Sequence, residues 1–153
     1  MEKKKKLIVQ TNKWPSLIIG FLILSLSACS TEPQPLRIGQ DNCDYCKMTI
    51  SDNRFGAEIV TKKGKIYKFD DEHCIMAFLN SKVIEQKEIA GIYFTDFNSP
   101  HELIDVEKAY FLQSPTLKSP MNGNIAAFRN QESREKVFIK FYGNFISWED
   151  MQK

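Results

Sequence analysis

Two thiols and a thioether fall within one short segment, Cys43-Asp44-Tyr45-Cys46-Lys47-Met48. The whole chain has only four Cys and five Met. Thiolate and thioether are soft donors, which select Cu(I), Zn(II) or iron–sulfur clusters over hard ions such as Mg(II). A Cys-x-x-Cys pair also occurs in redox sites and in structural disulfides. The segment alone therefore leaves three chemistries open.

The methionines differ in their expected roles. Met76 and Met151 are expected to fill gaps in the core, as most methionines do. In an extended segment the side chains of residues i and i+2 project to the same side, so Cys46 and Met48 are expected to reach one ion. Met121 follows Pro120 and precedes Asn-Gly, which places it on a loop. It is either a further soft ligand or a loop side chain that plugs the edge of the core.

A zinc site needs two more Cys or His ligands beside Cys43 and Cys46, and the nearby candidates are His73 and Cys74. Adjacent residues on a helix diverge by about 100°, which makes this pair a poor second half of the site. Cys74 is most simply a buried core thiol, and His73 a solvated helix residue. An exported zinc module that uses these four residues remains the main alternative.

Two further alternatives are a thiol–disulfide exchange protein and an interaction lipoprotein that binds no metal. The exchange activity requires the Cys-x-x-Cys to open a helix that lowers the thiol pKa. Here Met48-Thr49-Ile50 is β-prone and no long helix follows, so that activity is disfavoured. The chain also lacks a G-x-S-x-G motif, an H-E-x-x-H motif and a phosphate-binding glycine loop. We expect it not to be an enzyme.

Residues 1–28 are expected to be a signal peptide rather than part of the fold. Lys3 to Lys6 give a positive start, and the apolar run 17–24 is shorter than the ~20 residues that span a bilayer. Leu26-Ser27-Ala28-Cys29 resembles a bacterial lipobox, which predicts that Cys29 is the lipidated first residue of the mature protein. Ser30 after it resembles an outer-membrane sorting signal. Residues 29–41, which contain two prolines, are expected to be a tether.

Charge and cysteine count narrow the alternatives. The chain has 21 Lys+Arg and 19 Asp+Glu, of which five Lys and one Glu lie in residues 1–28, so the mature protein has a net charge of −2. We therefore expect no nucleic-acid partner. With Cys29 lipidated, three thiols remain, and three exported thiols cannot all pair within one chain. The odd thiol argues against a purely structural disulfide.

The predicted elements belong to an α+β domain over residues 42–153. Segments 57–61 and 66–69 form a hairpin around Gly64, and Asp70 or Asp71 caps a helix that carries Cys74 and Phe78. The second half has strands near 91–97, 110–112 and 125–128. A helix capped by Asn130 or Ser133 runs toward Gly143, and the tail with Trp148 and Met151 covers one end of the core. The halves predict two similar ββαβ-like lobes, about 42–90 and 91–153.

These residues together resemble the NosL family of nitrous oxide reductase accessory lipoproteins. The resemblance covers about residues 41–148. It rests on Cys43-x-x-Cys46-x-Met48, Phe55-Gly56-Ala57, the run 65–71 with Cys74, Pro120-Met121 and Ala126-Ala127-Phe128. Tyr142-Gly143-Asn144 departs from the family, where a Gly pair is common.

The resemblance implies a function, a ligand set and partners. It implies a Cu(I) chaperone for nitrous oxide reductase, with Cys46, Met48 and Met121 as copper ligands and Cys43 as an auxiliary thiol or a disulfide partner of Cys46. One thiolate and two thioethers would favour Cu(I) over Zn(II). The expected partners are nitrous oxide reductase and its assembly ABC transporter, and the expected location is the periplasmic side of the outer membrane.

Overall fold

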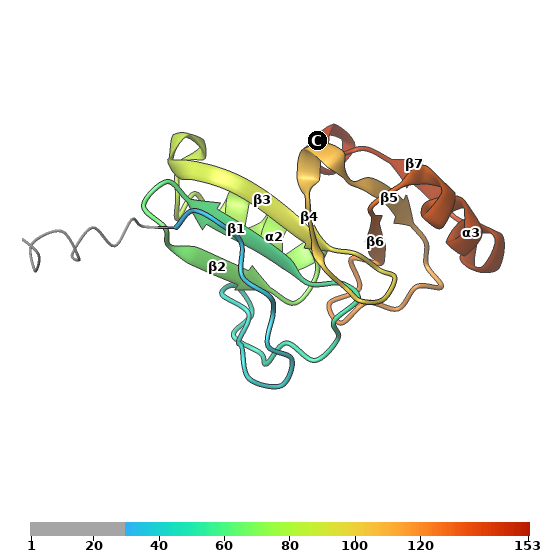
Figure 1. Cartoon of the computed structure of the whole chain (residues 1–153), viewed down its shortest axis with the longest axis horizontal. Helices are drawn as coiled ribbons and strands as arrows, with labels where there is room; N and C mark the ends of the chain where they lie inside the picture. Colours follow the sequence, from blue (N-terminus) through green and yellow to red (C-terminus); the bar gives the residue numbers. More distant parts are fainter. Residues whose placement is uncertain (1–29) are drawn as a thin grey trace, which may run out of the picture.

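The structure is a computed structural model that describes residues 30–153. It has two antiparallel sheets, each packed against a helix, which confirms the predicted α+β fold of two small lobes (Figure 1). The predicted signal peptide and Cys29 lie outside the described residues. No helix of the described part is long and apolar enough to cross a membrane.

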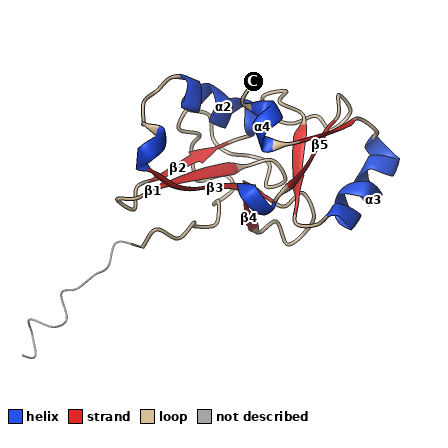
Figure 2. Cartoon of the chain, turned by 90° about the horizontal axis from the view of Figure 1, so that it is seen from above, coloured by secondary structure: helices blue, strands red, loops and turns tan. Residues whose placement is uncertain are grey.

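The first sheet has the strand order β2-β1-β3-β4 and is covered on one face by helix α2 (Figure 2). Gly64, at φ +77°, makes the turn between β1 and β2, as predicted. Asp71 caps α2 by accepting a hydrogen bond from the backbone N–H of Cys74. The elements of this lobe are β1 (Ala57–Thr61), β2 (Ile66–Phe69), α2 (Glu72–Asn80), a 3₁₀ turn (Gln86–Glu88), β3 (Ile89–Thr95) and β4 (Leu103–Asp105).

The second sheet has the order β6-β5-β7, and helix α3 packs against β5 and β6. Asn130 caps α3, and Gly143 follows its end at φ +124°, as the sequence predicts. The elements of this lobe are a 3₁₀ turn (Val106–Lys108), β5 (Tyr110–Gln113), β6 (Ile125–Phe128), α3 (Gln131–Phe141), β7 (Asn144–Ile146) and α4 (Trp148–Met151).

The two sheets divide later in the chain than residue 90, where the sequence analysis placed the lobe boundary. β3 pairs with β1, and β4 pairs with β3, so both belong to the first sheet. β3 belongs to the first sheet because its side chains Ile92 and Phe94 are buried in the core that this sheet covers. The sheets meet where the backbone N–H of Phe97 donates to the carbonyl of Ala127, 2.8 Å away.

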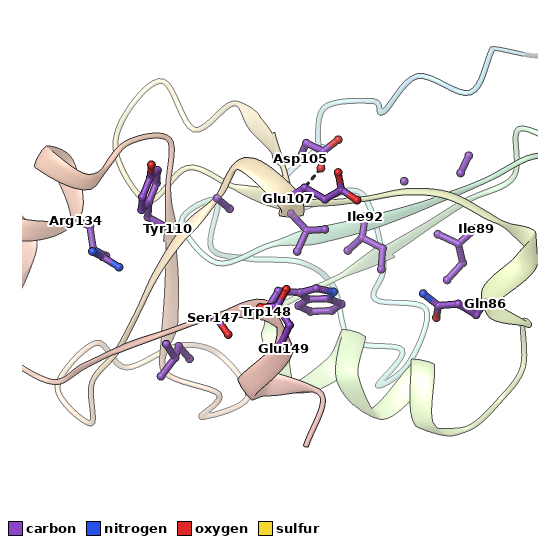
Figure 3. Close-up of a pocket in the computed structure, with 15 residues that line it drawn as sticks. Gln86, Ile89, Ile92, Asp105, Glu107, Tyr110, Arg134, Ser147, Trp148 and Glu149 are labelled. Atoms are coloured by element: carbon purple, nitrogen blue, oxygen red, sulfur yellow. Dashed lines mark hydrogen bonds between the residues drawn. The ribbon is translucent and has the colours of Figure 1, made fainter.

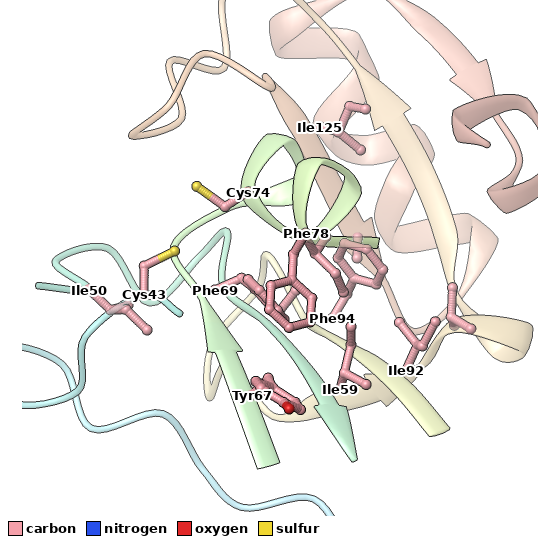
Figure 4. Packing of buried hydrophobic residues seen from close by; sticks show 14 of the residues in the cluster. Cys43, Ile50, Ile59, Tyr67, Phe69, Cys74, Phe78, Ile92, Phe94 and Ile125 are labelled. Atoms are coloured by element: carbon pink, nitrogen blue, oxygen red, sulfur yellow. The ribbon is translucent and has the colours of Figure 1, made fainter. Parts of the chain in front are cut away.

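The main core lies between the first sheet and α2 and continues into the second lobe through Phe111 and Ile125. It includes two sulfur atoms at one end (Figure 4). The rings of Phe69 and Phe78 pack in its middle at a centroid distance of 5.1 Å and an interplanar angle of 55°. Trp148 and Met151 pack against this core, which confirms the prediction for the tail. Two of the cysteines, Cys43 and Cys74, are therefore part of the packed core.

Candidate metal centre

Three thiols from two segments come together at the end of the core. The Sγ atoms of Cys43, Cys46 and Cys74 all lie within 4.8 Å of one another. Cys43 and Cys74 are fully buried, whereas Cys46 is half-buried, and all three are free. Figure 4 shows Cys43 and Cys74 beside each other at the edge of the apolar cluster. We call these three residues the thiol pocket.

The loop that carries Cys43 and Cys46 is closed on itself by backbone hydrogen bonds. The N–H of Cys43 donates to the carbonyl of Met48 (2.8 Å), and the N–H of Lys47 donates to the carbonyl of Cys43 (3.0 Å). Lys47 has φ +65°, in the left-handed region. The segment is therefore a tight turn rather than the extended strand assumed in the sequence analysis. The i, i+2 argument for Cys46 and Met48 does not apply to it.

Asp44 fastens this loop to β2. Its backbone N–H donates to the carbonyl of Lys68, and its carboxylate accepts the N–H of Lys68, both at 2.8 Å. The ammonium of Lys68 in turn lies 2.6 Å from a carboxylate oxygen of Asp41. Burial alone would raise the pKa of Asp41, but hydrogen bonds from Lys68 and Arg37 outweigh it and hold that pKa well below its usual range. These bonds fix Cys43 facing inward.

The third thiol reaches the pocket from α2. Cys74, Ile75 and Phe78 are the buried residues of this helix, which agrees with the prediction that Cys74 lies on the apolar face. The helix start is fixed by Asp71, so the position of Cys74 follows from that cap. His73, which precedes Cys74, is not part of the group of potential metal ligands found among residues 30–153.

The two predicted thioether ligands lie in different surroundings. Met48 is 57% exposed to solvent. Met121 is partly buried against the core cluster that contains Cys43 and Cys74. The structure thus brings Cys43 and Cys46 together with Cys74. It leaves Met48 at the surface and Met121 against the core.

Burial sets the protonation of the pocket. It raises the pKa of the Cys46 thiol, and it raises the pKa of Cys74 still further, with the neighbouring thiols Cys43 and Cys46 adding to the shift. Cys46 and Cys74 therefore keep their protons at neutral pH when no ion is bound. A metal ion must displace these protons, so its affinity rises with pH.

Comparisons with known proteins show what the chain is similar to. A model of the NosL family matches residues 35–153. The chain belongs to the NosL family. A search of curated proteins found no match. The crystal structure of the copper chaperone NosL from Shewanella denitrificans has a TM-score of 0.66 to this structure, at 19% identity, and covers 79% of this chain and 96% of that one. This similarity establishes the fold.

The donor set of this NosL-family protein suits a soft ion. Three sulfurs, of which only that of the half-buried Cys46 belongs to a residue with solvent exposure, match the preference of Cu(I) and Zn(II) for thiolate. A structural zinc site takes four ligands, and the thiol pocket supplies three. Two acidic residues at the start of α2, Asp70 and Glu72, precede the pocket residue Cys74 in the chain. Burial raises the pKa of both, that of Glu72 to about 7.

The sequence predicts Cys74 as a buried core thiol and not as one of the copper ligands Cys46, Met48 and Met121. It is a core thiol by burial and a pocket member by position. The odd number of exported thiols was the signal that could have placed it there, because a third thiol without a partner needs another role.

A separate cleft of about 740 Å³ lies between the lobes (Figure 3). Asp105, Trp148 and Glu149 line its centre, and Arg134 lies at one end beside Tyr110. No cysteine, methionine or histidine is among its lining residues. Its lining offers no soft ligand, so the thiol pocket remains the candidate metal centre.

Proposed function

We propose that this protein is a lipid-anchored Cu(I)-binding metallochaperone that supplies copper for assembly of the copper centre of nitrous oxide reductase. The observation that carries the proposal is the approach of three sulfur atoms within 4.8 Å in a NosL-family chain. A similar fold belongs to a protein described as a copper chaperone. The protein carries the ion as cargo and needs no catalytic residue.

We assign Cys46 as the first copper ligand. It belongs both to the thiol pocket and to the ligand set Cys46, Met48 and Met121 that the family resemblance implies. It is also the most accessible of the three thiols. Copper meets the exposed Met48 and Cys46 first and then gains the buried thiols. The reverse exchange of ligands releases it to an acceptor.

The proposed location follows from the start of the chain. Lipid on Cys29 holds the domain on the periplasmic side of the outer membrane. The tether is shorter than residues 29–41, because Leu36 packs against the core and Asp41 is buried in the domain. The acceptor is nitrous oxide reductase or its assembly ABC transporter. Mass spectrometry of the protein purified from membranes tests the anchor, because a diacylated peptide that begins at Cys29 is expected.

Copper binding is tested by titrating the domain, residues 30–153, with Cu(I) in competition with a chromogenic chelator. We expect a 1:1 complex that Cys46→Ser weakens by at least a hundredfold. Ser51→Ala is the matched control, since it removes the hydroxyl of an exposed residue five positions after Cys46 and leaves every sulfur in place. Equal affinity in the wild type and Cys46→Ser would overturn the assignment.

A zinc-binding module is the second candidate, favoured by the same three thiols together with one open ligand position. It predicts one zinc per chain in the protein as purified and loss of structure on addition of EDTA. The copper carrier predicts a folded domain without metal, because the buried aromatic and aliphatic side chains and the two sheets stabilise the fold without an ion. Metal analysis and circular dichroism with EDTA separate the two.

A further inference from the structure

Asp71 joins the two lobes beside the thiol pocket. Its side chain is fully buried, and no Lys or Arg of the described chain forms an ion pair with it. One carboxylate oxygen, Oδ1, accepts the backbone N–H of Cys74 at 3.3 Å. The other, Oδ2, accepts the hydroxyl of Ser119 at 2.7 Å and the backbone N–H of Met121 at 2.9 Å. A single carboxylate therefore holds the backbone of Cys74 and that of Met121.

The loop 119–123 is fitted closely to the start of α2. The N–H of Gly123 also reaches Oδ2 of Asp71, at 3.3 Å. A Cβ atom on Gly123 would lie 2.9 Å from Oε2 of Glu72 and 3.0 Å from the backbone nitrogen of His73. The loop 119–123 and the start of α2, about 50 positions apart in the chain, are therefore in direct contact. This contact is more specific than a helix cap requires, since a cap needs only the bond to Cys74.

We propose that Asp71 is a positioning residue that holds Met121 against the thiol pocket and thereby makes one mixed thiol–thioether site from both lobes. The proposal rests on the copper-binding function argued above. It adds that the second lobe contributes to the site through this carboxylate. The backbone of Met121 is linked to that of Cys74 before copper arrives, so only the Met121 side chain must be ordered when its thioether binds.

The variant Asp71→Asn breaks the link between the cap and the loop, because its side chain has only one acceptor oxygen. An amide oxygen can still accept the N–H of Cys74, but the NH₂ group then faces the N–H groups of Met121 and Gly123. If the Asn side chain is flipped, its oxygen accepts the N–H groups of the loop, and the bond that caps α2 is lost. We expect Cu(I) affinity to fall ten- to hundredfold, as for other residues that orient metal ligands. Asn130→Ala, which removes the cap of α3 far from the pocket, should leave Cu(I) affinity unchanged.

Gly123→Ala gives a second route that keeps Asp71 and the cap of α2. Its methyl group pushes the loop away from α2, so we expect a similar loss of affinity. In the Met121→Leu background, neither Asp71→Asn nor Gly123→Ala should weaken binding much further, because both act through Met121. Fully additive losses would overturn the proposal.

We call the hydrogen bonds between Asp71 and the loop 119–123 the clamp. Amide hydrogen exchange of the metal-free domain tests the clamp in the absence of copper. The Met121 amide should be protected in the wild type and exchange at least tenfold faster in Gly123→Ala. If the wild type binds no Cu(I), the proposed function fails, and this exchange measurement still decides whether the clamp exists. If the wild type binds Cu(I) and both variants bind it equally well, the clamp proposal fails and the copper function stands.

Discussion

The two lobes bury their helices to different depths. Helix α2 of the first lobe buries Cys74, Ile75 and Phe78, whereas α3 of the second lobe has no fully buried residue. The second lobe has a smaller buried core of its own, and at its surface the half-buried Phe138 packs against the exposed Phe145, with ring centroids 5.0 Å apart. The first lobe thus offers a dry, ordered place for thiols. The second contributes a loop, with Met121 at its tip.

The largest difference between the lobes is expected in their packing. Phe69→Ala removes a fully buried ring from the first core and should destabilise the protein by about 3–5 kcal/mol. Phe138→Ala removes a partly exposed ring from the second lobe, so its cost should be about 1 kcal/mol. Urea unfolding of both variants measures the difference. Equal costs would contradict the contrast between the lobes.

A second effect comes from Glu58, a fully buried residue of β1. Burial raises its pKa from 4.5 to about 7. The folded protein therefore keeps a proton that the unfolded chain loses above about pH 4.5. The free energy of unfolding then falls as pH rises from about 4.5 to 7, by about 3 kcal/mol.

In Glu58→Gln this contribution disappears, because the amide does not titrate. The stability difference between Glu58→Gln and the wild type should therefore change by about 3 kcal/mol across that pH range. Denaturant titrations at several pH values measure it. Glu107→Gln, at an exposed position in the 3₁₀ turn after β4, is the control and should follow the wild type.

A third test concerns the buried thiol of the first lobe. Cys74→Ser keeps the shape of the side chain and replaces a soft donor by a hard one. We expect Cu(I) affinity to fall at least tenfold, while the fold is retained. Unchanged affinity would show that the thiol pocket is not the copper site as a unit, and would favour the set Cys46, Met48 and Met121.

The smallest effect is expected at Met48, which is 57% exposed. Met48→Leu should change the equilibrium affinity for Cu(I) by only a few-fold, but it should slow the transfer of copper to a chelator. Stopped-flow measurements of transfer give the rate. A loss of affinity as large as that of Cys46→Ser would instead place Met48 among the main ligands.

Local signals in the sequence predicted most of the fold. Gly64 marked the hairpin, Asp71 and Asn130 marked the two helix starts, and each agrees with the structure. The short strands β4 and β7 were missed. Each has only three residues, so it carries no clear alternation, and pairing with a distant strand determines it.

The candidate site was harder to predict than the fold. The sequence indicated sulfur chemistry at Cys43, Cys46 and Met48, but the turn depends on Lys47 at φ +65°, a conformation that few residues other than glycine adopt. The inward direction of Cys43 depends on the bonds between Asp44 and Lys68, which are distant in sequence. Ligand positions set by such long-range bonds cannot be obtained from residue spacing.

The central claim is that copper binds in the sulfur-lined end of the first core, with Cys46 as a ligand. X-ray absorption at the copper edge, on the Cu(I)-loaded domain and on Cys46→Ser, tests it most directly. We expect a shell made of sulfur alone in the wild type and one sulfur fewer in the variant. A shell dominated by nitrogen or oxygen, or an identical shell in Cys46→Ser, would contradict it.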